Sequence, residues 1–427
     1  MPSLALTEMP LPLVRSFPSG LTIVAEQIPV PSVSLDLWIR VGSAVEPDEV
    51  NGMAHFLEHM IFKGTENLPP GAFDRRVEAV GANLNAATSQ EYTHYYFTAA
   101  PQDFAELAPL QLEVVTQPKL PPQEFEQERQ VVLEEILRSQ DNPERRIARH
   151  KLETVFATLP YRRPVLGPSE VIEQLQVQQM RSFHDQWYQP AQMTIAVVGN
   201  QPVETLVETI VQHLPQAFLE NSAPSPAPYP TLTPEPQISQ PLRQHYQDQQ
   251  LEQDRLVMVW RVPGLQDVED TYALDVLASV LAHGRTSRLV RRLREEQQWV
   301  RSITASNSNY QVQGLFSIQA RLGSTHRERV EAAIWEEIAK IQRGEITETE
   351  LNRVRTQVAS RFVFANERTQ SRAQLYGYYQ THLGEITPGL RYPQAIAAVT
   401  AEAVQTAAQT YLTPNQSITL TFSNLDR

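Results

Sequence analysis

Two stretches of the sequence, 223 to 224 residues apart, indicate how the chain is built. Residues 188–200 read YQPAQMTIAVVGN, and residues 411–424 read YLTPNQSITLTFSN. Three residues of the first stretch recur in the second at a constant offset of 224, with the tyrosine one residue out of step; the pairs are Pro190 and Pro414, Gln192 and Gln416, and Asn200 and Asn424. The helical patterns before both stretches match at the same offset: Ile172, Leu175 and Met180 correspond to Ile396, Val399 and Val404.

An earlier pair of segments shows the same relationship. Residues 33–42 read VSLDLWIRVG and residues 255–264 read RLVMVWRVPG, so that Trp38 and Gly42 match Trp260 and Gly264 at an offset of 222. Any two amphipathic helix–strand units share some likeness, which is the alternative explanation. Because helix, tyrosine, proline and strand recur in the same order at the end of each half, the pattern favours an internal duplication.

The predicted boundary between the two copies is rich in proline. The run SAPSPAPYPTLTPEP at residues 222–236 contains six prolines, which exclude an interior helix or a central strand. The sequence therefore predicts an N-terminal domain at residues 1–220, a linker at 221–240 and a C-terminal domain at 241–427.

Strand and helix patterns alternate within each copy. In the first half, residues 21–26, 34–41 and 91–99 are rich in apolar or β-forming residues and predict strands. Residues 52–63 and 122–139 carry helical periodicity, the second with one charged and one apolar face. This mixture predicts an α+β fold in which helices pack on one face of a mostly antiparallel sheet.

Composition excludes several classes of protein. The 427 residues are 41% hydrophobic and 20% charged, as expected of a folded globular protein. A net charge of -13 argues against nucleic acid as the main partner, and the absence of cysteine excludes disulfides, thiolate metal sites and cysteine nucleophiles. The N-terminal residues have neither a signal-peptide nor a transit-peptide pattern, and no apolar run reaches the roughly 18 residues of a membrane span. We therefore expect a cytoplasmic protein without a membrane span.

The residues most indicative of chemistry are His-Phe-Leu-Glu-His at positions 55–59. On a helix His55 and His59 share one face, so two imidazoles can bind one metal ion. Glu58 lies on nearly the same face and can reach water beside that ion without being a ligand. The order H-x-x-E-H is the reverse of the H-E-x-x-H metalloprotease helix. The alternative is a surface helix whose histidines have no function.

A catalytic zinc ion needs a third protein ligand and one open position. The helix predicted after Leu120 carries Glu128 and Glu135, which are seven residues apart and share a face. Val131 and Val132 lie between them, which predicts that this face is buried, and a buried carboxylate requires a partner such as a cation. Glu134, the residue before Glu135, points about 100° around the helix from it. A solvent-exposed helix face explains any single glutamate here equally well.

Taken together, these motifs resemble one enzyme family. Residues 55–65, with Gly42-Ser43 before them and Asn85-Ala86-Ala87-Thr88-Ser89 after them, are similar to the pitrilysin family of inverzincins. That family includes insulin-degrading enzyme and the mitochondrial processing peptidase, and the likeness to its short bacterial members extends over essentially the whole chain. It implies two homologous domains that form half of a clamshell. It also implies that the third ligand is Glu135, 76 residues after His59, and that Glu128 supports the site.

The second copy lacks these residues. At the offset of 222, His55, Glu58 and His59 correspond to Leu277, Val280 and Leu281; an offset of 226, which aligns Glu124 and Arg129 with Glu350 and Arg355, brings Glu135 onto Arg361. We therefore expect one Zn²⁺ per chain, in the first copy, and a degenerate second domain.

The resemblance implies a zinc-dependent endopeptidase that cleaves peptides or unfolded segments in a closed chamber, with Glu58 as the general acid and base. It places substrate on the edge strand that contains Asn85, Ala86, Ala87 and Thr88. A plain strand–turn segment is the alternative for that stretch. The alternatives for the function are a non-catalytic scaffold subunit and a metal-binding regulatory subunit.

One departure from the family pattern bears on partners. Family members place an arginine and a tyrosine, seven residues apart, against the substrate, whereas this chain has Arg294 followed by Arg301. Some short members work with a related chain that lacks zinc and carries the Arg/Tyr pair. We therefore expect a heterodimer with such a chain, with a homodimer as the alternative.

Overall fold

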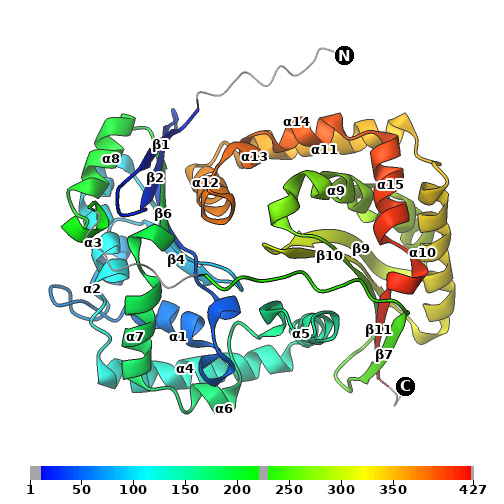
Figure 1. Ribbon diagram of the computed structural model, residues 1–427, viewed down its shortest axis with the longest axis horizontal. Coiled ribbons are helices and arrows are strands. Elements are labelled where there is room, and N and C mark those ends of the chain that lie inside the picture. The colour runs from blue at the N-terminus through cyan, green and yellow to red at the C-terminus, as the bar shows by residue number, and fades with distance from the viewer. Residues whose placement is uncertain (1–10, 221–228, 425–427) are drawn as a thin grey trace. The chain divides into compact units, whose positions relative to one another are not determined.

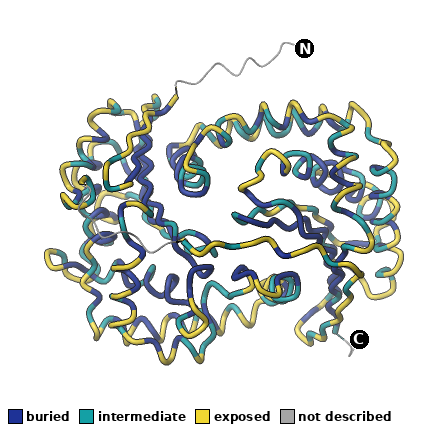
Figure 2. The backbone as a smooth tube through the Cα atoms, viewed as in Figure 1, coloured by how far each residue is buried: buried dark blue, intermediate teal, exposed yellow. Residues whose placement is uncertain are grey.

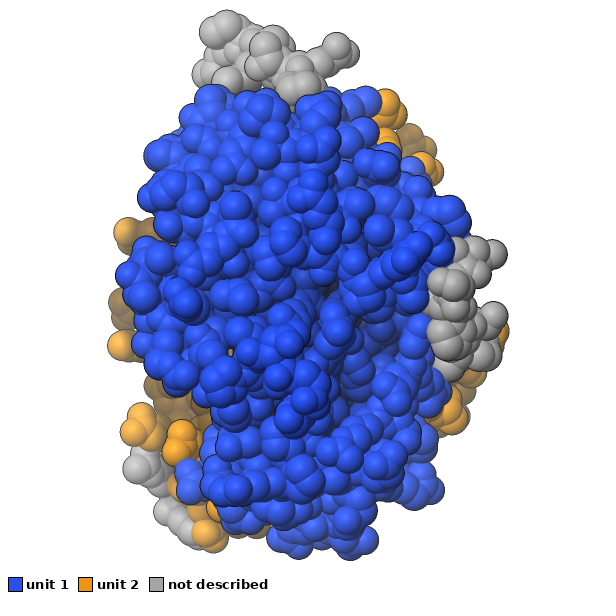
Figure 3. Space-filling view, turned by 90° about the vertical axis from the view of Figure 1, so that its left-hand side faces the viewer, with its two compact units in different colours: residues 1–136, 165–229, 364–386 blue, residues 137–164, 230–363, 387–427 orange. Residues whose placement is uncertain are grey.

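The computed structural model describes residues 11–220 and 229–424 of the chain. They form two compact units, each built around one β-sheet with its own apolar core (Figure 1). Unit 1 comprises residues 1–136, 165–229 and 364–386, and unit 2 comprises residues 137–164, 230–363 and 387–427 (Figure 3). No helix in the described part of the chain has the length and apolarity that crossing a membrane requires.

Unit 1 contains a six-stranded sheet in the order β1-β2-β6-β3-β5-β4. Its strands are β1 (Leu13–Ser16), β2 (Thr22–Gln27), β3 (Val33–Ile39), β4 (Asn83–Thr88), β5 (Thr93–Ala99) and β6 (Met193–Gly199). All neighbours are antiparallel except β2 and β6, which are parallel. β4 therefore forms one edge of this sheet.

Unit 2 repeats this topology with five strands in the order β7-β11-β8-β10-β9. Its strands are β7 (Leu242–Gln247), β8 (Asp254–Pro263), β9 (Val300–Asn309), β10 (Gln313–Leu322) and β11 (Ile418–Ser423). The β7–β11 pair is parallel and the other three pairs are antiparallel, as in the series β2-β6-β3-β5-β4. The repeated stretches in the sequence thus fall on equivalent strands, which supports the duplication.

The helices of unit 1 are α1 (Met53–Ile61), α2 (Ala72–Ala79), α3 (Phe104–Thr116), α4 (Pro122–Asp141), α6 (Ser169–Ile172), α7 (Val177–Trp187), α8 (Val203–Val211) and α12 (Thr369–Leu383). Those of unit 2 are α5 (Pro143–Val155), α9 (Val268–Ala282), α10 (Arg327–Gln342), α11 (Glu348–Ala365), α13 (Thr387–Leu390), α14 (Tyr392–Ala398) and α15 (Ala401–Tyr411). The last turn of α4 and the last two residues of α11 cross the division between the units.

Alternation along the central strands builds the main core of each unit. In β3, Leu35 and Leu37 point into the same cluster as Phe56 of α1 and Leu107 of α3. In Figure 2 these central strands are dark blue, in keeping with the complete burial of β3 and β6. The predicted α+β fold with mostly antiparallel sheets and a main helical layer is confirmed.

The second face of each sheet receives a helix from the other half of the sequence. Trp38 points to the opposite face of β3 from Leu35 and Leu37, and there it contacts Tyr378 of α12. On the corresponding face of β8, Arg261 donates to the carbonyl of Val155 in α5. The compact units therefore differ from the sequence repeats at residues 1–220 and 241–427, because each repeat contributes one helix to the unit of the other.

A buried ion pair attaches α12 to the sheet of unit 1. The guanidinium of Arg372 donates to both carboxylate oxygens of Glu26, which lies on β2, and the Tyr376 hydroxyl donates to Glu26 Oε2 at 2.6 Å. The two charged side chains are 5% and 4% exposed. Gly377 permits the close approach, since a Cβ at this position would overlap the Trp38 indole. Sequence patterns did not indicate this contact across 346 residues.

The predicted local elements agree closely with the structure. The strands expected at residues 21–26, 34–41 and 91–99 correspond to β2, β3 and β5, and the helices expected at 52–63 and 122–139 correspond to α1 and α4. The predicted linker begins at residues 221–228, which lie outside the described residues. The remainder, 229–240, has no helix or strand. Within it Glu235 is buried against Arg261 and accepts hydrogen bonds from the backbone of Ala157, Thr158 and Leu159.

We expect Arg372→Ala to lower the free energy of unfolding by about 3–5 kcal/mol, because the variant leaves the Glu26 carboxylate buried without its counter-ion. Urea denaturation followed by circular dichroism measures this change. Arg368→Ala is the matched control, since Arg368 is exposed and precedes the same helix. Equal stability of the two variants would contradict the assignment of Arg372 as the anchor of α12.

Candidate metal centre

Helix α1 presents the histidines of the motif, and its start is held by unusual local structure. Gly52 adopts a left-handed conformation with φ 98°, and a Cβ there would lie 2.7 Å from the carbonyl oxygen of Leu166. The buried carboxylate of Glu46 then accepts hydrogen bonds from the backbone N–H groups of Gly52 at 2.8 Å and Ala54 at 2.7 Å. These bonds satisfy N–H groups at the start of the helix and fix the position of the turn that carries His55.

Helix α4 packs against α1 and supplies carboxylates. The rings of Phe56 and Phe125 stack with centroids 4.6 Å apart, which aligns the two helices. One and two turns further along α4, Glu128 and Val132 are buried as expected. The expectation that Val131 is buried with them is wrong: Val131 is 48% exposed, because it lies about 100° around the helix from Val132.

The packing brings His55, His59 and Glu135 together. Glu135 Oε2 lies 3.4 Å from His55 Nε2 and 3.6 Å from His59 Nε2. Ligand atoms bound to a tetrahedral zinc ion at roughly 2.0–2.2 Å are separated by about 3.4 Å, so these distances suit zinc. Two nitrogens and one carboxylate oxygen leave a fourth position open, as in catalytic zinc sites. Within residues 11–220 and 229–424, this is the only such group that could hold a metal ion.

Glu128 supports the cluster through the other nitrogen of His59. His59 Nδ1 lies 2.9 Å from Glu128 Oε1, so Nε2 is directed toward Glu135, and Lys63 Nζ lies 2.5 Å from Glu128 Oε2. Burial lowers the pKa of His59, but the hydrogen bonds with Glu128 and Glu135 outweigh burial and raise it to about 9. The site therefore favours a positive charge between these carboxylates, which a proton or a metal ion can supply.

Glu58 is not part of the ligand cluster. Its Oε2 accepts a hydrogen bond of 2.5 Å from the Thr88 hydroxyl on β4. Burial raises the pKa of Glu58, against the opposing effects of Thr88 and His59, and the charge of Glu135 raises it further. An elevated carboxylate pKa suits a group that must take up a proton and release it again near neutral pH.

The predicted substrate strand, β4, forms one edge of the sheet and contacts Glu58 through Thr88. β4 pairs with β5 on one side only, and exposure alternates along it. The Ala86 N–H donates to the side-chain oxygen of Asn85 at 2.9 Å. Asn85, Ala86 and Ala87 thus lie on the open edge of the sheet, where the Asn85 side chain already accepts from the Ala86 N–H, whereas the Thr88 hydroxyl bonds to Glu58.

The corresponding positions in unit 2 cannot bind a metal. Leu277, Val280 and Leu281 lie in α9 and are fully buried in the apolar core. Arg361 is exposed on α11. Arg294 lies on the π-helical turn Val290–Glu296, where its Nε donates to Glu295 at 2.8 Å, and Arg301 is exposed on β9. A role of Arg294 in binding substrate stays a prediction.

Sequence reasoning missed two residues that organise the site. Lys63 follows His59 by four residues, a spacing that places both on one face of a helix and could have indicated their shared partner Glu128. Glu46 acts through backbone N–H groups, for which the sequence holds no pattern beyond an acidic residue before a predicted helix.

Comparison with known proteins shows to which family the chain is related. The model of the insulinase family, peptidase family M16, matches residues 22–169, and the model of the peptidase M16 inactive domain matches residues 174–358. An uncharacterized zinc protease of Mycobacterium leprae is 30% identical over 400 residues, which are 93% of this chain and 88% of that protein. The chain belongs to peptidase family M16.

Other M16 relatives match over nearly the whole chain. A probable mitochondrial-processing peptidase subunit beta of Arabidopsis thaliana is 26% identical over 93% of this chain and 76% of its own length. The crystal structure of a protease from Helicobacter pylori covers 97% of this chain and all of its own, with a TM-score of 0.90 and 24% identity. That structure shares the fold described here. The family is thus one of zinc metallopeptidases, and the model that matches the second half describes an inactive domain.

For this M16 chain we expect Glu135→Gln to weaken zinc binding by at least about tenfold, since the variant replaces a charged oxygen ligand by a neutral amide. Zinc content after dialysis against a competing chelator, measured by atomic absorption, tests this. Glu134→Gln is the control, because Glu134 is the adjacent, exposed carboxylate on the same helix. Equal zinc affinity of both variants would remove Glu135 from the ligand set.

Proposed function

We propose that the chain is a zinc-dependent endopeptidase whose single metal site is His55, His59 and Glu135. The observation that carries this proposal is the convergence of Glu135 Oε2 on both imidazole Nε2 atoms, at 3.4 and 3.6 Å, with Glu58 beside them on the same helix as the histidines. Names of relatives that refer to zinc proteases agree with this chemistry.

The donor set fits zinc, which when bound supplies Lewis-acid chemistry: it polarises a peptide carbonyl and makes water a better nucleophile at neutral pH. Glu58 moves the protons. Because Thr88 holds Glu58 Oε2, Oε1 is the atom that takes the proton from the attacking water and returns it to the leaving amine. Glu128 keeps His59 in the tautomer that directs Nε2 to the metal.

Substrate binds in an extended conformation along β4 in this proposal. A peptide that pairs with the open edge at Asn85, Ala86, Ala87 and Thr88 forms main-chain hydrogen bonds and brings a peptide bond toward Glu58. The small side chains of Ala86 and Ala87 allow this approach. Such binding selects peptides and unfolded segments, because a folded protein cannot present a free strand here.

We expect Glu58→Gln to lower kcat/KM by about 10²–10⁴, since an amide cannot accept the proton. The assay is hydrolysis of a quenched fluorescent, unstructured peptide, with zinc content measured on the same samples. Zinc content stays at the wild-type level because Glu58 is outside the ligand cluster. Glu78→Gln, at an exposed position on α2, is the control.

The outcome of that assay separates the candidate functions. An active Glu58→Gln variant contradicts the role given to Glu58. Zinc binding without turnover by any preparation supports a metal-binding regulatory subunit, and the absence of both supports a scaffold subunit.

A cytoplasmic location stays a prediction from the sequence.

The partner is a related M16 chain that carries an Arg/Tyr pair, with a homodimer as the alternative. What supports this is the exposed Arg301 at the position where the family resemblance calls for tyrosine, seven residues after Arg294. A chain without the tyrosine lacks one of the groups expected to contact the substrate carbonyl. The proposed catalytic unit is therefore completed by a second chain.

We accordingly expect the zinc-loaded chain alone to hydrolyse the quenched peptide poorly and Arg301→Tyr to increase its turnover. Light scattering coupled to size-exclusion chromatography gives the oligomeric state of each preparation. Full activity of the chain as a homodimer, unchanged in Arg301→Tyr, would contradict the heterodimer.

A further inference from the structure

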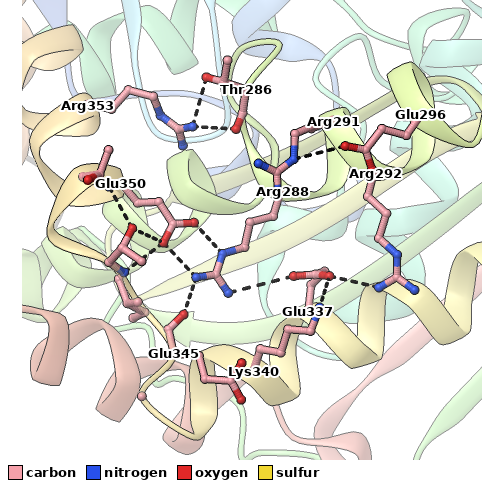
Figure 4. Close-up of a pocket in the computed structure, with 14 residues that line it drawn as sticks. Thr286, Arg288, Arg291, Arg292, Glu296, Glu337, Lys340, Glu345, Glu350 and Arg353 are labelled. Carbon is pink, nitrogen blue, oxygen red and sulfur yellow. Dashed lines mark hydrogen bonds and ion pairs between the residues drawn. The ribbon is translucent and has the colours of Figure 1, made fainter.

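Unit 2 contains a pocket of about 950 Å³ that is lined mainly by charged side chains (Figure 4). The segment after α9 contributes Thr286, Arg288, Arg291 and Arg292, α10 contributes Glu337 and Lys340, and the start of α11 contributes Glu350 and Arg353. None of these residues belongs to the metal centre. Four arginines and one lysine from three segments would repel each other unless anions balance them.

Two of the lining carboxylates pair with Arg288, Arg292 and Lys340. Glu350 accepts from Arg288 Nε at 2.7 Å and Nη2 at 2.9 Å, and also from the backbone and hydroxyl of Thr347. These contacts outweigh burial and lower the pKa of Glu350 to about 2, so it stays ionised. Glu337 is bound by Arg292 at 3.0 Å and Lys340 at 2.8 Å. Glu337 Oε2 lies 3.9 Å from Arg288, so both carboxylates pair with cations other than Arg353 and Arg291.

The remaining two carboxylates make one ion pair outside the pocket and one weak ion pair at it. Glu345 pairs with Arg343, which does not line the pocket. Glu296 makes one loose ion pair of 3.6 Å with Arg291, and both side chains are more than half exposed. Arg291 is therefore only weakly neutralised.

Arg353 forms no direct ion pair with these carboxylates among the described residues. Its Nη1 donates to the carbonyl and hydroxyl oxygens of Thr286 at 2.8 and 3.1 Å. Its Nε and Nη2 are buried, and neither has a hydrogen-bond acceptor among the described residues. Buried donors without acceptors are rare in folded proteins, and a missing ion or water commonly explains them.

The charges around Arg353 also indicate that an anion is missing beside it. Burial lowers the pKa of Arg353, Glu350 opposes this, and the neighbouring Arg288 and Arg291 lower it again. In Figure 4 the side chains of Arg353, Arg291 and Arg288 lie around one pocket, with the carboxylate of Glu350 turned to Arg288. An additional anion in the pocket would relieve this repulsion.

We propose that this pocket binds the phosphate group of a small anionic ligand, held by Arg353 and Arg291. A rotation of the Arg353 side chain brings Nε and Nη2 to a phosphate, and the exposed Arg291 closes on it from the segment after α9. Guanidinium groups form their strongest hydrogen bonds with such oxyanions. A phosphate dianion accepts donors from several directions, which suits two arginines on different elements better than the planar carboxylate does. The pocket exceeds the size of one phosphate, so it also accommodates phosphate esters and chains.

The test is isothermal titration of the zinc-loaded, full-length chain with inorganic phosphate, pyrophosphate and tripolyphosphate, at constant ionic strength. We expect saturable binding with a Kd of about 1 mM or below. Arg353→Gln should weaken binding by about tenfold or more, because charge-assisted hydrogen bonds are lost. Arg329→Gln is the charge-matched control, since Arg329 is exposed on α10 and outside the pocket, and it should bind as the wild type does.

A second variant keeps the test possible if the first one misfolds. If circular dichroism shows that Arg353→Gln does not fold, Arg291→Gln replaces it, because Arg291 is 63% exposed. Phosphate that binds at the zinc site instead would bind equally to the wild type and to both variants, which overturns the proposal. Acetate binding as tight as that of phosphate overturns the ligand class, and no saturable binding overturns the site.

Discussion

Three carboxylates and two imidazoles share one partly buried space in unit 1, and this crowding of negative charge governs the site. Glu58, Glu128 and Glu135 all act on the histidines of α1 or on one another. Such a group is stable only with compensating positive charge. Lys63 supplies one part, on the far side of Glu128. The hydrogen bonds with Glu128 and Glu135 outweigh burial and raise the pKa of His59 to about 9, so a proton or a metal ion can supply the remainder of the positive charge.

Within this crowded site the three glutamates have different partners. Glu135 faces both Nε2 atoms, Glu128 faces Nδ1 of one ring, and Glu58 faces a hydroxyl on the neighbouring strand. These partners fit the roles proposed for the three residues, which are a metal ligand, a residue that holds the His59 tautomer and a carrier of protons. The roles follow from the partner of each carboxylate, since the carboxylates themselves are alike.

Helix exchange makes each unit depend on both halves of the chain. The sheet that positions β4 and α1 is covered on its second face by α12, from beyond residue 360, through the Glu26–Arg372 pair. Unit 2 receives α5 in return. The two units also use their related helices differently. Glutamates of α4 face the histidines of the proposed metal centre. By contrast Glu350 of α11, at the position equivalent to Glu124, accepts hydrogen bonds from Arg288 at the pocket of unit 2.

Local sequence patterns predicted the elements, the internal repeat and the shared helix face of His55 and His59, because strand alternation and helical spacing are local properties that reappear in the fold. Spacing left Glu135 undecided against a solvent-exposed face, and the family resemblance selected it. Only the folded structure shows the exchange of α5 and α12, the bonds from Lys63 to Glu128 and from Thr88 to Glu58, and the unsatisfied Arg353. Each of these depends on what lies across from a residue. Periodicity reports which face of its own element a residue occupies, and the group opposite comes from a distant part of the chain.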